Sequence, residues 1–266
     1  MPGEESPSLF KDRPLLMLFD GDAVAHRAYH ATEKTHLSVK KTGEPTGAVF
    51  GFTNTLLKAI ADLKPTHCAV AFDRPTPTFR HIQYEAYKAQ RPRTPEELVA
   101  QLQRIRQVVE ALSIPTYEID GYEADDVLGT LSRQASQQDT DVVICTGDTD
   151  TLQLVSPHIS VYLWNPYTGK ATLYNEAGVR ERYGLNPNQI ADLKALQGDT
   201  SDNIPGVPGI GEKTAVRLLQ EFQSVKGILA NLDKIGPPKT QETLRANQEQ
   251  ANLCIQLTTI ETSVPI

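Results

Sequence analysis

The sequence predicts an α/β protein with a largely parallel sheet, followed by a smaller all-helical module. Short apolar runs alternate with helical patterns from residue 14 to residue 160, as is typical of βαβ units. From about residue 184 this alternation gives way to helical patterns and a Gly- and Pro-rich turn. The 266 residues are enough for one large domain and a second, smaller module.

Five apolar runs are expected to form the strands of the sheet. They cover residues 14–20, 67–73, 114–120, 141–150 and 159–165, and the fourth of them runs into acidic residues. Each run is short and bounded by polar residues, so a buried parallel sheet accounts for all five.

Helical patterns fill the gaps between these strands. The pattern predicts helices over residues 47–63 and 94–112, and the second has a capping residue in Thr94 and a proline at its first turn. A third helix opens within "YEADDVLGTLSRQA", which places apolar side chains on one face.

The C-terminal part reads as two helices around a tight turn, with further helical sequence behind them. The helices are expected over residues 186–198 and 212–222, and "IPGVPGIG" lies between them. This stretch nearly matches a phosphate-binding P-loop, but Glu212 takes the place of the lysine and a helix, rather than a strand, precedes it. Helix, glycine turn and helix instead indicate a helix-hairpin-helix, whose backbone N–H groups can hold a DNA phosphate; a plain Gly-rich connection is the alternative.

Composition excludes several classes of protein. No apolar run approaches the length of a membrane span, and the acidic, polar N-terminus is unlike a signal peptide and reads as a loose leader. The three cysteines share no metal-ligand spacing, which favours reduced thiols in a cytoplasmic protein over zinc. A net charge of −7 argues, at face value, against a nucleic-acid partner.

Carboxylates follow the predicted strands and the first helix of the module. They are Asp20, Asp73, Glu123, Asp125, Asp126, Asp148, Asp150, Asp199 and Asp202. Any one of them could be a helix cap or a solvated loop residue, but parallel strands bring their carboxyl ends to one edge, where ligands bind. So many acids at one edge require cations, and oxygen ligands without His or Cys suit Mg²⁺ or Mn²⁺.

With these nine acids set aside, the remaining acids are slightly outnumbered by the 26 bases, which removes the objection to a nucleic-acid partner. The bases also cluster. Residues 78–93 place Arg80, Lys88 and Arg91 among aromatic side chains, and helical spacing would put Tyr84, Lys88 and Arg91 on one face. Bases neutralise phosphate and aromatic rings stack on unpaired nucleobases. An amphipathic helix with a solvated basic face explains the pattern equally well.

The chain resembles the 5′-nuclease (flap endonuclease) family, and most closely the 5′→3′ exonuclease domain of bacterial DNA polymerase I. The likeness covers nearly the whole chain from about residue 14. It rests on "LFDGD", "VAFDRPTPTFRHIQYEAYKAQR", "GYEADDVLGTL", "TGDTDTLQLV" and "GDTSDNIPGVPGIGEKTA". The chain departs from the usual family pattern at His26, Pro75 and Thr149, and none of these is a candidate metal ligand.

The resemblance implies a PIN-like nuclease domain over residues 1–183, with a helical arch at about residues 76–108. A helix-hairpin-helix (H3TH) DNA-binding module would follow over residues 184–266. The resemblance divides the nine acids between two metal sites, with Asp126 the least secure ligand. It makes Lys88 and Arg91 catalytic residues whose positive charges face the scissile phosphate and neutralise the charge that grows on it. A further set implied to contact DNA consists of Arg80, Tyr84, Tyr87, Gly206, Gly209, Gly211, Lys213 and Thr214. The hairpin would also bind a monovalent cation such as K⁺.

The function expected from the sequence is a structure-specific, metal-dependent 5′ nuclease. It would act on DNA with 5′ flaps, nicks or RNA primers, using two or more Mg²⁺ or Mn²⁺ ions. We expect a cytoplasmic, nucleoid-associated monomer, and interpret the chain as the front piece of a longer polymerase rather than a free-standing nuclease. Two alternatives are a haloacid-dehalogenase-type phosphatase, suggested by the Asp-x-Asp of "FDGDAV", and a DNA-binding module without catalysis.

Overall fold

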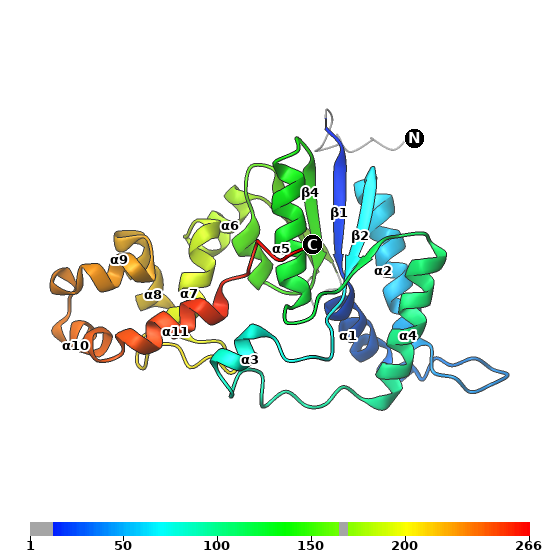
Figure 1. Ribbon diagram of the computed structural model, residues 1–266, viewed down its shortest axis with the longest axis horizontal. Helices are drawn as coiled ribbons and strands as arrows, with labels where there is room; N and C mark the ends of the chain where they lie inside the picture. Colours follow the sequence, from blue (N-terminus) through cyan, green and yellow to red (C-terminus); the bar gives the residue numbers. More distant parts are fainter. Residues whose placement is uncertain (1–12, 165–169) are drawn as a thin grey trace.

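The computed structural model describes residues 13–164 and 170–266 and has a six-stranded sheet at its centre (Figure 1). The strand order is β3-β2-β1-β4-β5-β6, in which β6 alone pairs antiparallel with its neighbour. The strands are β1 (Leu15–Asp20), β2 (His67–Ala71), β3 (Thr116–Tyr117), β4 (Asp141–Thr146), β5 (Ile159–Trp164) and β6 (Ala171–Tyr174). The predicted, largely parallel sheet is confirmed.

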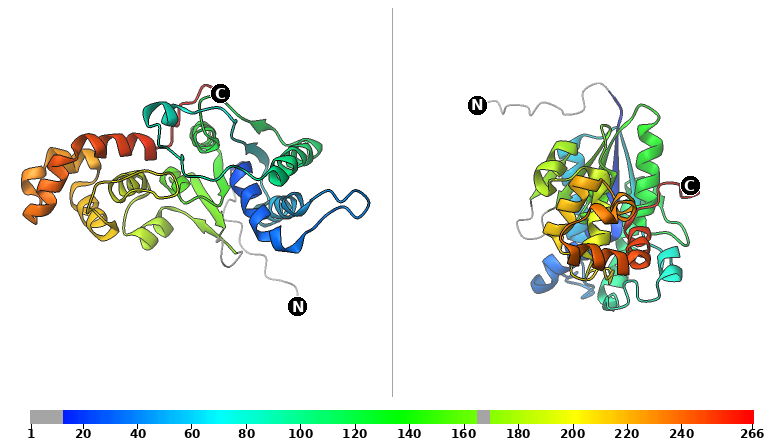
Figure 2. Two further views of the ribbon diagram at one scale, coloured as in Figure 1. Left: turned by 90° about the horizontal axis from the view of Figure 1, so that it is seen from below. Right: turned by 90° about the vertical axis from the view of Figure 1, so that its left-hand side faces the viewer.

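Helices cover both faces of the sheet, because alternate residues of each buried strand point to opposite sides. The helices of this part are α1 (Gly21–Thr32), α2 (Gly47–Leu63), α3 (Phe79–Gln83), α4 (Glu96–Ala111), α5 (Ala124–Ser136) and α6 (Glu176–Tyr183). Met17 and Phe19 of β1 pack with α1, α2 and α4, whereas Leu18 packs with α5. Seen from below, α5 lies on one side of the strands and α1 and α2 on the other (Figure 2).

The C-terminal module has its own hydrophobic core and projects from one end of the sheet (Figure 1). Its helices are α7 (Ile190–Gln197), α8 (Glu212–Phe222), α9 (Val225–Ala230), α10 (Pro238–Ala246) and α11 (Gln248–Thr258). Gly206, in the turn before α8, has φ +66° and approaches Gly198 so closely that an added Cβ would lie 2.2 Å from the Gly198 nitrogen. This position therefore requires glycine for packing within the turn.

The fold differs from the sequence expectation in several places. Helices α1 and α6 and strand β6 form where no element was predicted, and the third strand is limited to two residues. The helical face proposed for residues 84–91 does not exist, because α3 ends at Gln83 and Lys88 has a left-handed φ of 54°. Helix α4, expected to belong to the arch, instead buries Leu98, Ile105 and Val109 in the core beside α2. Residue 165, the end of the expected fifth strand, lies outside the described residues.

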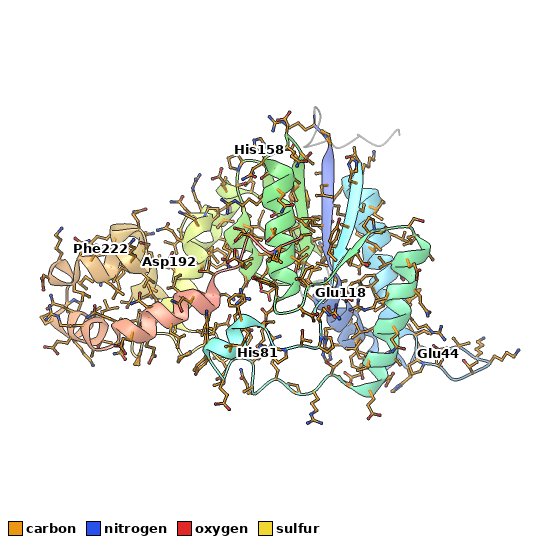
Figure 3. All side chains as sticks on the ribbon, viewed as in Figure 1. Glu44, His81, Glu118, His158, Asp192 and Phe222 are labelled. Atoms are coloured by element: carbon orange, nitrogen blue, oxygen red, sulfur yellow. The ribbon has the colours of Figure 1, made fainter. Side chains whose placement is uncertain are left out.

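The chain between α3 and α4, residues 84–95, passes beneath the carboxyl ends of the strands (Figure 1). We refer to these residues as the arch segment. In Figure 3 the labelled His81 marks α3, where this segment begins. Helix α3 and the arch segment thus border the edge of the sheet to which the acidic residues were assigned.

Candidate active site

The carboxyl edge of the sheet gathers the predicted acids from several elements. Asp20 is the last residue of β1, and its carboxylate caps α1 by accepting a hydrogen bond from the Ala23 N–H (3.0 Å). Asp73 follows β2 and accepts from the Ala124 N–H at the start of α5 (2.7 Å). Asp148 follows β4 and accepts from the Asp150 N–H (2.9 Å). The strand ends thus hold these carboxylates by main-chain hydrogen bonds, in the arrangement expected for open parallel sheets.

Burial makes these carboxylates difficult to ionise without a compensating cation. Burial raises the pKa of Asp20 to about 7, although hydrogen bonds from Thr146 and Ala23 oppose the shift. Burial raises the pKa of Asp148 as well, and holds that of Asp125 well above its ordinary value, with Asp20 and Asp148 adding like-charge repulsion at Asp125. Asp125 also has a buried carboxylate oxygen, Oδ1, that finds no hydrogen-bond partner among the residues that the structure describes. An orphaned acceptor among crowded carboxylates is suited to a bound cation.

Basic side chains contact several of the predicted acids. The Lys88 ammonium donates to Glu123 Oε1 (2.7 Å), and Arg91 donates to Asp202 Oδ1 (2.6 Å). Lys194 of α7 pairs with both Asp150 and Asp199, at 2.7 Å from Asp199 Oδ2.

The pair with Lys194 changes the pKa of Asp199. Burial would raise the pKa of its carboxyl group, but hydrogen bonds from Lys194 and Ser201 outweigh this and lower the pKa to about 2. These ammonium and guanidinium groups thus pair directly with only some of the acids, which are Glu123, Asp150, Asp199 and Asp202.

The donor chemistry fits hard divalent cations, since all of the candidate ligands are carboxylates. Within the described residues, no three His, Cys, Asp or Glu side chains converge closely enough to define a metal position. Lys88 instead pairs with Glu123, and Lys194 pairs with Asp150 and Asp199. Asp20 and Asp148 are close enough to Asp125 to raise its pKa by like-charge repulsion, and the partnerless Asp125 oxygen belongs to this group.

Tyr87 connects the acids that follow the third strand with those of the C-terminal module. Its hydroxyl lies 3.1 Å from Glu123 Oε2 and 3.0 Å from Asp202 Oδ2. The ring is 2% exposed and packs into the core of the module. A buried ring of this kind cannot stack on DNA in this structure, so the predicted DNA contact at Tyr87 is not supported, and Tyr84 is half-buried against the same core.

Arg80 and Asp126 also differ from their predicted roles. Arg80 is 3% exposed, and its guanidinium donates to both carboxylate oxygens of Asp126, at 2.7 and 2.8 Å. Asp126 is fully buried. Arg80 is therefore inaccessible to DNA, and the two oxygens of Asp126 are already engaged, so a metal-ligand role does not fit that residue.

The hairpin residues divide into a buried and an exposed group. Gly206 is buried, whereas Gly209, Gly211 and Lys213 are exposed and Thr214 is half-buried. Gly211 caps α8 without a side-chain hydrogen bond, so no capping side chain covers the N–H groups of the first turn. This is the geometry that a phosphate-binding helix N-terminus needs.

Sequence reasoning missed two charged residues of this edge. Asp22 accepts from the Asp73 N–H (2.6 Å), and burial together with the neighbouring Asp73 raises its pKa to about 7. Its signal was the Asp-x-Asp spacing with Asp20. Lys194 had no comparable signal, because its position inside α7 does not reveal that it faces Asp150 and Asp199.

The protein combines an open α/β sheet, which has carboxylates at its carboxyl edge, with an arch segment that carries basic residues and with an attached helical module. Metal-dependent nucleases are one class of α/β protein with such an arrangement, because their carboxylates hold divalent ions. The family model described as 5′-3′ exonuclease, N-terminal resolvase-like domain, matches residues 15–184. The model described as 5′-3′ exonuclease, C-terminal SAM fold, matches residues 185–266. The chain belongs to the 5′-3′ exonuclease family.

Curated relatives are bacterial polymerases. The chain is 52% identical to DNA polymerase I of Chloroflexus aurantiacus over 256 residues, which is 95% of this chain and 27% of that protein. It is 42% identical to DNA polymerase I of Bacillus subtilis over 255 residues, covering 96% of this chain and 29% of that protein. The chain thus spans less than a third of the length of these relatives.

Solved structures share the fold. The bacteriophage T5 5′-exonuclease with bound divalent metal ions (zinc) has a TM-score of 0.73 and 23% identity, and the match covers 93% of this chain and 90% of that chain. The catalytic core of Rad2 in complex with DNA substrate has a TM-score of 0.57 and 15% identity, with 94% and 82% coverage. The family match accounts for Asp20 and Asp22 without a phosphatase, and that alternative is not retained.

Proposed function

We propose that this chain is a structure-specific 5′ nuclease that hydrolyses phosphodiesters in DNA and in RNA primers on DNA. The observation that carries the proposal is the buried carboxylate cluster at the sheet edge, approached by Lys88 and Arg91 from the arch segment. Family membership and the fold support it. The substrates we propose are 5′ flaps, nicks and primer ends, met during primer removal and repair.

Divalent cations, Mg²⁺ or Mn²⁺, would supply an activated water and stabilise the leaving oxygen. Asp20, Asp125 and Asp148 would hold them on one side, and Asp150, Asp199 and Asp202 on the other. Lys88 and Arg91 are already held over the site, and they would turn from the acids to the charged phosphate of the bound strand.

The C-terminal module would grip duplex DNA through the exposed N-terminus of α8, next to Gly209, Gly211 and Lys213. We propose the division at residues 183 and 184, a monovalent cation such as K⁺ at the hairpin, and a monomeric state. The similarity to DNA polymerase I supports a further proposal, that the chain acts together with a polymerase domain.

The direct test uses a 5′-labelled flap duplex with Mg²⁺ or with EDTA. Cleavage that requires Mg²⁺ and releases 5′-phosphate products is expected, and Asp125→Asn should lower kcat by about 10³-fold or more if the ion generates the nucleophile. Asp233→Asn, at an exposed position of the helical module, is the control and should cleave normally. Tight DNA binding in EDTA without cleavage in Mg²⁺ would instead support the non-catalytic binding module.

A further inference from the structure

Arg80 forms a buried junction between three parts of the chain. It lies on α3 at the base of the arch segment and pairs with Asp126 of α5 through two hydrogen bonds, at 2.7 and 2.8 Å. The same guanidinium donates to the main-chain oxygens of Leu257 (2.9 Å) and Thr259 (2.8 Å), at the end of α11. Because the Arg80 side chain is only 3% exposed, it has neither a DNA-contacting role nor the role of a solvated surface charge.

Asp126 links Arg80 to the candidate active site. Its Oδ2 accepts from the Glu123 N–H (3.0 Å), so that Asp126 and Glu123 cap α5 reciprocally, and its Oδ1 accepts from the Glu261 N–H (2.8 Å). Arg80 itself lies 3.6 Å from the Glu123 carboxylate. Glu123 in turn accepts from Lys88 and Tyr87, two residues of the arch segment.

We propose that Arg80 is a positioning residue for the nuclease reaction. Through Asp126 and its own contact it fixes the backbone and carboxylate of Glu123, and the main-chain oxygens at the end of α11 hold its guanidinium in place. This inference rests on the proposed function. Asp126 and Arg80 would orient the candidate ligand Glu123 without binding the metal themselves. Loss of groups that orient a ligand in this way weakens metal binding, although no ligand is removed.

The geometry requires the planar guanidinium rather than a positive charge alone. Three nitrogens of Arg80 donate to four acceptors that belong to Asp126, Leu257 and Thr259. A lysine at this position would keep the charge, but its three donors on a single nitrogen cannot reach the same set of acceptors. Arg80→Lys therefore tests the hydrogen-bonding geometry of the guanidinium while the positive charge is kept.

The experiment compares the wild type with Arg80→Lys and with the double variant Arg80→Gln/Asp126→Asn, which removes both buried charges together. Arg104→Gln is the matched control, because it removes an arginine that pairs with Glu44 far from the carboxylate edge. Mn²⁺ binding is measured by electron paramagnetic resonance without DNA. The kcat and KM are measured on the flap duplex in Mg²⁺, and DNA affinity is measured in EDTA.

We expect both Arg80 variants to bind Mn²⁺ about 10- to 100-fold more weakly, with a matching fall in kcat. Their KM and their DNA affinity in EDTA should match those of the control, and circular dichroism should show that the fold is kept. Wild-type Mn²⁺ affinity in Arg80→Lys would overturn the proposal, as would a loss of DNA affinity with Mn²⁺ binding unchanged. Failure of the wild type to cleave in Mg²⁺ would overturn the proposed function alone, because the Mn²⁺ measurement still decides the role of Arg80.

Discussion

Several carboxyl groups of this protein are buried near other acids, and in the metal-free chain the nearby basic side chains do not fully offset the free-energy cost of ionising them. Asp20 and Asp22 have raised pKa values because they are buried near other acids, and Asp125 keeps an oxygen without a partner. Nearby bases neutralise other members of the cluster, as Lys194 does for Asp199. The acids therefore fall into two groups: those with a lysine or arginine beside them, and those that need a bound metal ion to ionise.

The pH dependence of stability follows from the acids that lack a cation. The pKa values of Asp20 and Asp22 are raised from 3.8 to about 7, so between these values the folded protein binds more protons than the unfolded chain. In EDTA, the free energy of unfolding should therefore fall as the pH rises from about 4 to about 7. Each of the two carboxyl groups contributes at most about 1.4 kcal/mol to this fall for every step of one pH unit. Asp199 has the opposite sign, and its contribution is lost only below this window.

Urea unfolding of the metal-free protein at pH 5 and pH 8 measures this effect. Asp20→Asn should reduce the difference between the two pH values, and saturating Mg²⁺ should raise stability more at pH 8 than at pH 5. Equal stability at both pH values in EDTA would contradict the assignment of raised pKa values.

The arch segment is the element whose structure depends most on a distant partner. Residues 84–95 contain no helix, and tertiary hydrogen bonds hold them to the loop after α7. Lys88 N–H donates to the Asp202 carbonyl (2.9 Å), Gln90 donates to the Thr200 carbonyl (2.7 Å) and Asn203 donates to the Ala86 carbonyl (2.7 Å). Segments that depend on few such bonds open at low free energy.

Asp202→Asn should loosen the arch segment, because it removes the charge that Arg91 and Lys88 pair with. We expect faster hydrogen–deuterium exchange at residues 86–93, by about tenfold if one charge-assisted hydrogen bond is lost. Exchange in β1 and β4 should be unchanged. Asp233→Asn, which breaks an exposed ion pair with Arg245 in the helical module, is the control. Equal protection in wild type and Asp202→Asn would show that other contacts fix the arch.

At the scale of the whole molecule, the C-terminal segment (residues 259–264) joins the helical module to the α/β part. Ile260 and Val264 are buried, and the Ile260 N–H donates to Gln153 (2.9 Å) while the Val264 N–H donates to Thr130 (3.1 Å). Most of the helical module has its own hydrophobic core, so we expect this segment and the contacts of α7 and α11 to couple the unfolding of the two parts.

The double variant Ile260→Ala/Val264→Ala should uncouple the two parts. Each substitution removes buried apolar volume, and the isoleucine alone should cost about 2–5 kcal/mol. Trp164 is the single tryptophan and packs on Phe19 in the core beside α1, so its fluorescence reports the α/β part, whereas circular dichroism reports all helices. The two unfolding curves should coincide in the wild type and separate in the variant. Coincident curves in the variant would assign the coupling to α7 and α11.

The local pattern of the sequence was enough to predict the parallel sheet, the helical module and an acidic edge, because apolar periodicity and acids at strand ends are short-range signals. It failed at β6, α6 and the helical face of residues 84–91, where partner elements override local preference. At the edge itself, Asp20 and Asp148 were found from their strands, whereas Lys194 was not, because its charge matters only through residues that the fold brings to it.

The sequence by itself determined which residue types this protein has at the ends of its strands and in its glycine turn, and so the kind of chemistry it can support. Only the tertiary structure decided that Arg80 is buried against Asp126 rather than presented to DNA. A basic residue in a polar stretch has the same local pattern in either case. What differs is a carboxylate 46 positions further along the chain and two carbonyls about 180 positions away, and pairing at such separations is fixed by packing alone.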